Sequence, residues 1–155
     1  MGLDKDFGLA FSKSQIAAGN SLPTKGLAFI SLKDKHKNEG IDLAKKLVQL
    51  NFTMCGTEGT ANAIKKNGIK CKKVNKVSGG SPHIVDILNA KKIALVINTG
   101  GGKRAYRVLD STSLRRATLI NKVPYCTNMS TAYACLEGIK SLKSKKINVK
   151  AIQEL

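Results

Sequence analysis

The sequence predicts an α/β fold in which helices cover both faces of a five-stranded parallel sheet, a three-layer α/β/α arrangement of the Rossmann-like kind. Two observations lead to this prediction. Short apolar runs of strand length alternate five times with segments of helical periodicity, and the links between them are short. The run "IALVIN" at residues 93–98 is apolar on both faces, as a central parallel strand is.

The expected strands are apolar runs bounded by polar or glycine-containing turns. They occupy residues 26–32, 52–55, 71–75, 93–98 and 123–127. The run at 71–75 is the weakest of the five, because lysines interrupt it. Polar, small and basic residues follow each run, at the edge of a parallel sheet where ligands bind in such folds.

Each expected strand is followed by an expected helix. These helices occupy residues 36–51, 60–68, 83–92, 111–121 and 130–143. The first of them has an apolar face formed by Ile41, Ala44, Leu47 and Val48. We expect the side chain of Asp110 to cap the start of the helix at 111–121.

A further helix is expected within residues 4–23, ahead of the alternating part of the chain. Phe7, Ala10, Phe11 and Ser14 form a stripe along it. No strand accompanies this helix, so it either packs on the domain or belongs with a part of a longer protein.

Composition limits the classes of protein. At 155 residues, with 42% hydrophobic residues, the chain has the size of one domain with a proper core. No apolar run is long enough to span a membrane, and the first residues do not resemble a secretory signal, so we expect a cytoplasmic protein. The four cysteines lack metal-ligand spacing, which predicts reduced, buried thiols and no metal site.

The formal net charge of +17 raises the possibility of a nucleic-acid-binding module. Aromatic residues, on which bases would stack, make up only 5% of the chain. We therefore interpret the charge as a lysine-rich surface and expect no nucleic-acid partner. The alternative rests on the charge alone.

The clearest candidate site is the stretch "GTEGT", which joins the expected strand at 52–55 to the next helix. Thr57 and Thr60 lie where a helix begins, and free N–H groups and the helix dipole favour an anion there. Gly56 and Gly59 allow the backbone to approach a ligand closely. Taken alone, the stretch fits an ordinary capped turn equally well.

Two lysines favour the anion site. Lys37 follows the first expected strand and Lys76 follows the third, so parallel topology brings both ammonium groups toward the threonines. Together these residues predict a pocket for a monophosphate. Asn98 and Thr99, at the end of the central strand, could hydrogen-bond a base or sugar. Asp110 could accept ribose hydroxyl groups.

Several stretches, taken in order, resemble the methylglyoxal-synthase-like domain, in the version found at the C-terminus of the large chain of carbamoyl-phosphate synthase. They are "FISLKDKHK", "GTEGTA", "NGIKCKKVNKVSGGSPHIVDIL", "LVINTGGGKRA" and "DSTSLRRATLINKVPYCT". The resemblance runs from about residue 26 to residue 143. It implies a linker and helix from a preceding domain at residues 1–25, the effector-binding domain at 26–143 and a basic tail at 144–155.

The resemblance implies regulation. It predicts an allosteric domain that binds nucleoside monophosphate effectors, with UMP as inhibitor and IMP as activator. The family's phosphate-binding positions fall on Lys37, Thr57, Thr60 and Lys76, and its base and ribose contacts fall on Asn98, Thr99 and Asp110. The chain departs from the family at His36, at Ser81 and in the glycine-rich loop after Thr99, so base preference is left open.

The resemblance also implies partners. They are the ATP-grasp domains of the same chain and the glutaminase small chain, in an enzyme that makes carbamoyl phosphate for arginine and pyrimidines. ATP and Mg would bind to those other domains, and no cofactor is expected in this part. Residues 1–20 would contact the preceding domain and would pack poorly on residues 26–143.

One enzyme alternative remains, a methylglyoxal synthase acting on dihydroxyacetone phosphate. That reaction needs a carboxylate base, which the synthases carry in a turn after the third strand. The corresponding turn here, "SGGSPH", has no acid before Asp86. We therefore expect no catalytic residue in this chain.

Overall fold

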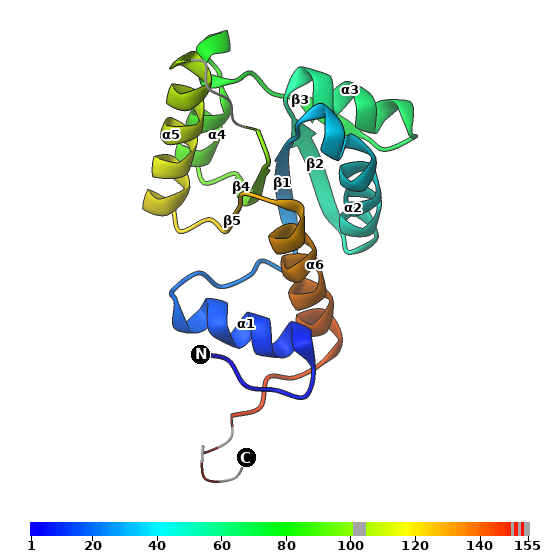
Figure 1. Ribbon diagram of the computed structural model, residues 1–155, viewed down its shortest axis with the longest axis vertical. Helices are drawn as coiled ribbons and strands as arrows, with labels where there is room; N and C mark the ends of the chain where they lie inside the picture. Colours follow the sequence, from blue (N-terminus) through cyan, green and yellow to red (C-terminus); the bar gives the residue numbers. More distant parts are fainter. Residues whose placement is uncertain (101–104, 150, 152, 154–155) are drawn as a thin grey trace.

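The computed structural model describes residues 1–100, 105–149, 151 and 153, and describes residues 105–108 through their backbone alone. The described residues form one sheet of five parallel strands in the order β3-β2-β1-β4-β5 (Figure 1). The strands are β1 (Gly26–Ser31), β2 (Phe52–Gly56), β3 (Cys71–Lys73), β4 (Ile93–Asn98) and β5 (Tyr125–Cys126). This confirms the predicted sheet.

Helices cover both faces of the sheet (Figure 1). One face carries α2 (Lys37–Gln49), α3 (Glu58–Lys66) and α6 (Met129–Ser144), and the other carries α4 (Ile84–Asn89) and α5 (Ala105–Ile120). Strand β1 supplies both cores, because Ala28 and Ile30 face one layer while Phe29 faces the other. The three-layer α/β/α arrangement is therefore confirmed.

The buried face of α2 is rotated from the predicted one. It consists of Gly40, Leu43, Ala44 and Leu47, whereas Val48 is 42% exposed. Gly40 belongs to it because a side chain there would meet the methyl groups of Leu32. Ala44 and Leu47 belong to both faces, so the prediction was correct for these two and wrong for Val48. Gly40 was missed because a glycine carries no hydrophobic signal.

The predicted start of the helix at residue 111 is wrong. Helix α5 begins at Ala105, so Asp110 lies inside the helix and does not cap it. Ala, Arg and Leu within residues 105–109 favour a helix, whereas an Asp such as Asp110 is common at helix starts and therefore suggested a later one. Leu114 and Ala117 bury the face of α5 that contacts the sheet.

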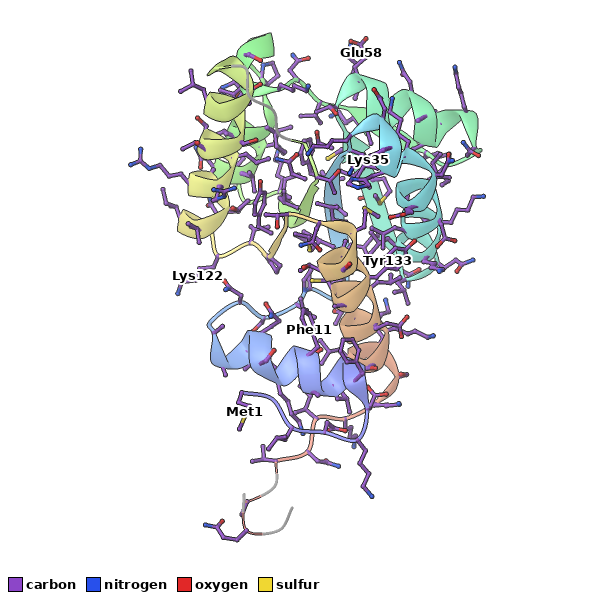
Figure 2. The ribbon with its side chains drawn as sticks, viewed as in Figure 1. Met1, Phe11, Lys35, Glu58, Lys122 and Tyr133 are labelled. Atoms are coloured by element: carbon purple, nitrogen blue, oxygen red, sulfur yellow. The ribbon has the colours of Figure 1, made fainter. Side chains whose placement is uncertain are left out.

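The expectation that residues 1–20 pack poorly is wrong for the helix they contain. Helix α1 (Phe7–Ala17) crosses the C-terminal half of α6 and packs on it (Figure 1). Leu9 and Ser12 are buried there, while Phe7 is 62% exposed. Figure 2 shows Phe11 where α1 meets α6, and this half-buried ring packs against the core.

Small residues make this contact possible. A Cβ on Gly8 would lie 2.5 Å from the carbonyl oxygen of Glu137, and a Cβ on Gly138 would lie 2.9 Å from Ser12 Oγ. The two backbones therefore approach each other where a larger side chain would clash. Of the predicted stripe, Phe11 packs against the core and Phe7 is exposed, while the fully buried residues of this helix are Gly8, Leu9 and Ser12.

The four cysteines are buried and free, as predicted. Burial raises the pKa of the Cys55 thiol to about 12 and that of Cys71 to about 11. None of the described helices combines the length and the apolar character that a membrane crossing requires. Within the described ranges no cluster of three potential metal ligands occurs.

A carboxylate fixes α1 to the end of α6. Asp6 caps α1 by accepting a hydrogen bond from the Leu9 backbone N–H at 2.8 Å, and it accepts another from Ser141 Oγ at 2.6 Å. Lys145 Nζ pairs with its second oxygen. The Lys145 and Ser141 donors, followed by the Leu9 N–H, hold the pKa of Asp6 well below its usual range.

We predict that Asp6→Asn lowers the free energy of unfolding at pH 7. A lowered pKa in the folded state means that the carboxylate stabilises the fold above its ordinary pKa of 3.8. The difference between the variant and the parent should therefore shrink as the pH falls below that value. Denaturant titrations of both proteins at a series of pH values measure this difference in the free energy of unfolding.

Asp34→Asn is the control, because the side chain of Asp34 is 93% exposed and pairs with nearby Lys37 at the surface. It should change the stability far less. Equal unfolding midpoints for Asp6→Asn and the parent at pH 7 would contradict the prediction.

Candidate functional site

A cavity of about 770 Å³ opens at the carboxyl ends of the strands. Residues at or just after the ends of β1, β2, β3 and β4 line it, and one side of α5 closes it. Glu58, in its lining, lies at the opposite end of the molecule from Met1 (Figure 2). The cavity therefore occupies the edge at which ligands of parallel sheets bind, away from the α1–α6 contact.

The start of α3 forms one wall of the cavity. Strand β2 ends in Gly56, where a Cβ would lie 2.6 Å from the Ile30 carbonyl oxygen, so only glycine permits this close approach of β2 to β1. Thr57 occupies the N-cap position of α3 without a capping hydrogen bond from its side chain. Glu58, Gly59 and Thr60 of the first helical turn line the cavity, and the Thr57 side chain supplies no acceptor to the N–H groups of this turn.

Three hydroxyl groups meet at this wall. Thr57 Oγ1 lies 3.3 Å from Ser31 Oγ and 3.4 Å from Thr60 Oγ1, and Thr60 Oγ1 accepts a hydrogen bond from the Leu32 backbone N–H at 3.0 Å. Thr60 is 2% exposed, so its position is fixed by packing. A hydroxyl that accepts one hydrogen bond still has a proton to donate, which suits an anion in the cavity.

Four lysines line the cavity, of which two were predicted. Lys37 begins α2, and its Nζ lies over the first turn of α3, 3.8 Å from where a Cβ of Gly59 would be. Lys76 follows β3. Lys33 and Lys73 are the additional ones, and the sequence analysis passed over them because lysines are common throughout the chain.

Three carboxylates balance much of that charge. Asp34 lies 2.6 Å from Lys37 Nζ, and Glu58 lies 2.6 Å from Lys73 Nζ. Each lysine holds the pKa of its partner carboxyl below the usual range, first through the hydrogen bond and then through its charge. The third carboxylate is Asp110. An anion that enters the cavity therefore meets four lysines, of which Lys37 and Lys73 already pair with carboxylates.

Asn98 and Thr99 have different surroundings. The side chain of Asn98 lines the cavity, where its amide donates to Tyr125 Oη at 3.1 Å and its oxygen accepts from the Gly100 backbone N–H at 3.0 Å. Thr99 is 4% exposed and does not line the cavity, and its hydroxyl accepts a hydrogen bond from the Lys33 backbone N–H. Thr99 therefore supports the loop after β1.

Asp110 reaches the cavity from the second turn of α5. Its carboxylate accepts hydrogen bonds from the backbone N–H of Ser78 at 2.9 Å and from Ser78 Oγ at 2.8 Å. The loop that carries Lys76 is thereby tied to α5. Sequence reasoning missed Ser78, because nothing in the sequence indicates its contact with a residue 32 positions away.

Six of the seven predicted site residues thus line one cavity, and Thr99 lies behind it. The predicted glycine loop extends to Gly102, and residues 101–104 lie outside the described part of the chain. A second, larger hollow of about 1090 Å³ lies between the C-terminal ends of α2 and α3. Its lining is mainly apolar and contains none of the predicted site residues.

Residues 39–127, more than half of the chain, match the family model described as the MGS-like domain. The chain belongs to the MGS-like domain family. A methylglyoxal synthase from Elizabethkingia anophelis NUHP1 has a similar fold, with a TM-score of 0.58 over 74% of this chain and 79% of the synthase. Its sequence identity of 17% supports likeness of fold alone.

Two relatives match this MGS-like chain over nearly its whole length. It is 42% identical to the carbamoyl phosphate synthase large chain, C-terminal section, of Methanopyrus kandleri, covering 100% of this chain and 28% of that protein. It is 45% identical to the carbamoyl phosphate synthase large chain of Mesorhizobium japonicum, covering 99% of this chain and 13% of that protein. The chain therefore spans less than a third of either relative.

Glu58 offers a test of the charge balance in the cavity. We predict that Glu58→Gln binds inorganic phosphate more tightly, by roughly three- to tenfold at low salt, because the change removes a negative charge and releases Lys73. Phosphate titrations followed by NMR measure the affinity.

Glu137→Gln makes the same change of charge on the exposed side of α6, outside the cavity, and should leave the affinity unaltered. Equal gains in the two variants would mean that net charge, and not the cavity, attracts phosphate.

Proposed function

We propose that this chain is an effector-binding regulatory section of a carbamoyl-phosphate synthase large chain, and that its cavity binds nucleoside monophosphates. UMP as inhibitor and IMP as activator are the effectors that we propose. One observation supports this most: hydroxyl groups at the start of α3 share a single cavity with Lys37 and Lys76. The similarity to large-chain sections over the whole sequence agrees with it.

The phosphate end of the ligand would lie against α3. The helix N-terminus carries partial positive charge, and the hydroxyl protons of Thr57 and Thr60 can point to phosphate oxygens. Lys76 lies at the cavity rim, and Lys37 stands over the same helical turn. These cations offset the charge of a phosphate dianion.

The nucleoside would extend toward α5. Asn98 presents an amide at the end of β4, and Asp110 presents a carboxylate that can accept hydrogen bonds from sugar hydroxyl groups. A cavity of about 770 Å³ falls within the usual range for sites that bind small molecules. We propose Asn98 and Asp110 as the base and ribose contacts and no longer assign a direct contact to Thr99.

The ion pairs and hydrogen bonds of the carboxylates favour a regulatory role over methylglyoxal synthesis. A base that removes a carbon-bound proton needs a free carboxylate in reach of the substrate. Asp34 and Glu58 are each held by a lysine, which lowers their pKa and weakens them as bases. Asp110, the third carboxylate of the cavity, accepts two hydrogen bonds from Ser78. Asp86 accepts hydrogen bonds from Ser81 and His83 and lies outside the cavity lining. Formation of methylglyoxal from dihydroxyacetone phosphate by the purified protein would overturn this choice.

The remainder of the proposed enzyme supplies the chemistry. ATP and Mg would bind to ATP-grasp domains of the large chain, and ammonia would come from the glutaminase small chain, in the cytoplasm. The role of this section would be to make the activity of those domains depend on which nucleotide is bound, through different affinities of the effector for active and inactive states.

Calorimetric titration with UMP and IMP tests the proposed site. We predict that Lys76→Ala weakens binding of both nucleotides by roughly ten- to a hundredfold, because a hydrogen bond to a charged group contributes about 1.5–3 kcal/mol. Uridine and inosine, which lack the phosphate, should bind more weakly still.

Lys72→Ala is the matched control, because Lys72 is an exposed lysine on β3 that does not line the cavity. It should bind the nucleotides as the parent does. Unchanged affinity in Lys76→Ala, or an equal loss in Lys72→Ala, would place the phosphate elsewhere.

In the complete enzyme, we predict that Lys76→Ala abolishes the effect of UMP and IMP on the rate of carbamoyl phosphate synthesis. The rate without effector should stay near that of the parent, because the substituted side chain lies in the effector cavity. Steady-state rates with and without effector measure both quantities. A large loss of the unregulated rate would contradict a purely regulatory role.

A further inference from the structure

The contact between Ser78 and Asp110 closes one end of the cavity. Ser78 belongs to a short 3-10 turn, Val77–Gly79, that follows Lys76, and Asp110 belongs to α5. Both residues line the cavity, and both are exposed enough to meet a ligand. Figure 1 shows the chain after β3 crossing toward the side of the sheet that α4 and α5 cover.

The contact uses both oxygens of the carboxylate. Oδ1 of Asp110 accepts from the Ser78 backbone N–H at 2.9 Å, and Oδ2 accepts from the Ser78 hydroxyl at 2.8 Å. A ribose 2′,3′-diol offers the same pattern, two neighbouring donors directed at two oxygens of one carboxylate. The carboxylate has further lone pairs, but the inner face of the cavity cannot hold a serine hydroxyl and a sugar hydroxyl at one position.

We infer that Ser78 is an internal competitor for the ribose diol, and that it determines how strongly the cavity prefers ribonucleotides over nucleotides without the diol. This rests on the proposed function, since it assigns the ribose to Asp110. When a ribonucleotide binds, its diol replaces the Ser78 hydroxyl on Asp110 and releases the turn from α5. The turn begins one residue after Lys76, so release also frees the backbone next to this phosphate-binding lysine.

A nucleotide without the diol has a different effect. It leaves the Ser78–Asp110 contact intact, because nothing in the ligand can replace the two donors. The turn Val77–Gly79 is therefore released from Asp110 when the bound sugar is ribose and stays bonded to it when the diol is missing. Ser78 is a specificity-determining residue in this account, and it acts through Asp110.

The test compares UMP with the monophosphate of 2′,3′-dideoxyuridine in calorimetric titrations of the parent protein and Ser78→Ala. The variant removes one competing donor, so it should bind UMP roughly three- to tenfold more tightly, as expected for one hydrogen bond. It should bind the dideoxy nucleotide with unchanged affinity. Ser113→Ala, which removes a hydroxyl from α5 outside the cavity lining, should change neither affinity.

A second measurement needs no variant. Hydrogen exchange at the Ser78 backbone N–H, followed by NMR in the parent protein, should be faster with UMP bound than with the dideoxy nucleotide bound. Equal exchange in the two complexes would overturn the inference.

The titrations separate this inference from the proposed function. If Ser78→Ala loses affinity for both nucleotides alike, the contact only braces the turn, and the inference fails while nucleotide binding stands. The inference also fails if the variant binds UMP as the parent does. If the parent binds UMP no better than uridine, the proposed function fails and the inference fails with it.

Discussion

All five strands run in the same direction, and this constraint places every carboxyl end of the sheet at one edge. Four lining residues of the cavity lie far apart in the sequence, yet each of them ends a strand or follows one: Lys37, Thr57, Lys76 and Asn98. The parallel topology brings them together. The close approach of β2 to β1 at Gly56 sets where α3 begins. The helix N-terminus is thereby aimed into the space that the strand ends enclose.

The charges in the cavity agree with the proposed regulatory role. Four lysines against three carboxylates give a small local excess of positive charge, although the whole chain carries +17. Two lysines are paired with acids, and Asp110 is held by Ser78. A ligand that binds here must therefore replace some of these contacts with its own. Under the proposed function, the replaced contacts would make the affinity of the ligand differ between the active and inactive states.

The fold, and the meeting of six of the seven candidate residues at one cavity, could be predicted from the sequence, because apolar runs mark strands and parallel topology aligns their ends. What failed had physical causes. Small residues, which carry no hydrophobic signal, direct the packing of α1 through Gly8 and Gly138. The start of α5 was misplaced because Asp110 resembles a capping residue. The sequence also did not predict the contacts of Glu58 with Lys73 and of Ser78 with Asp110. These contacts depend on how close separate segments lie in space, and the spacing of residues along the chain does not show this.

We propose that the start of α3 and the ends of its neighbouring strands hold the phosphate of a nucleotide. Backbone amide chemical shifts measured by NMR during titration with UMP test this placement most directly. We expect the largest changes at residues 31–33, 57–60 and 76–78, and no change at residues 57–60 with uridine. Changes gathered along the apolar hollow between α2 and α3, or equal changes with uridine, would show that the phosphate does not bind at the start of α3.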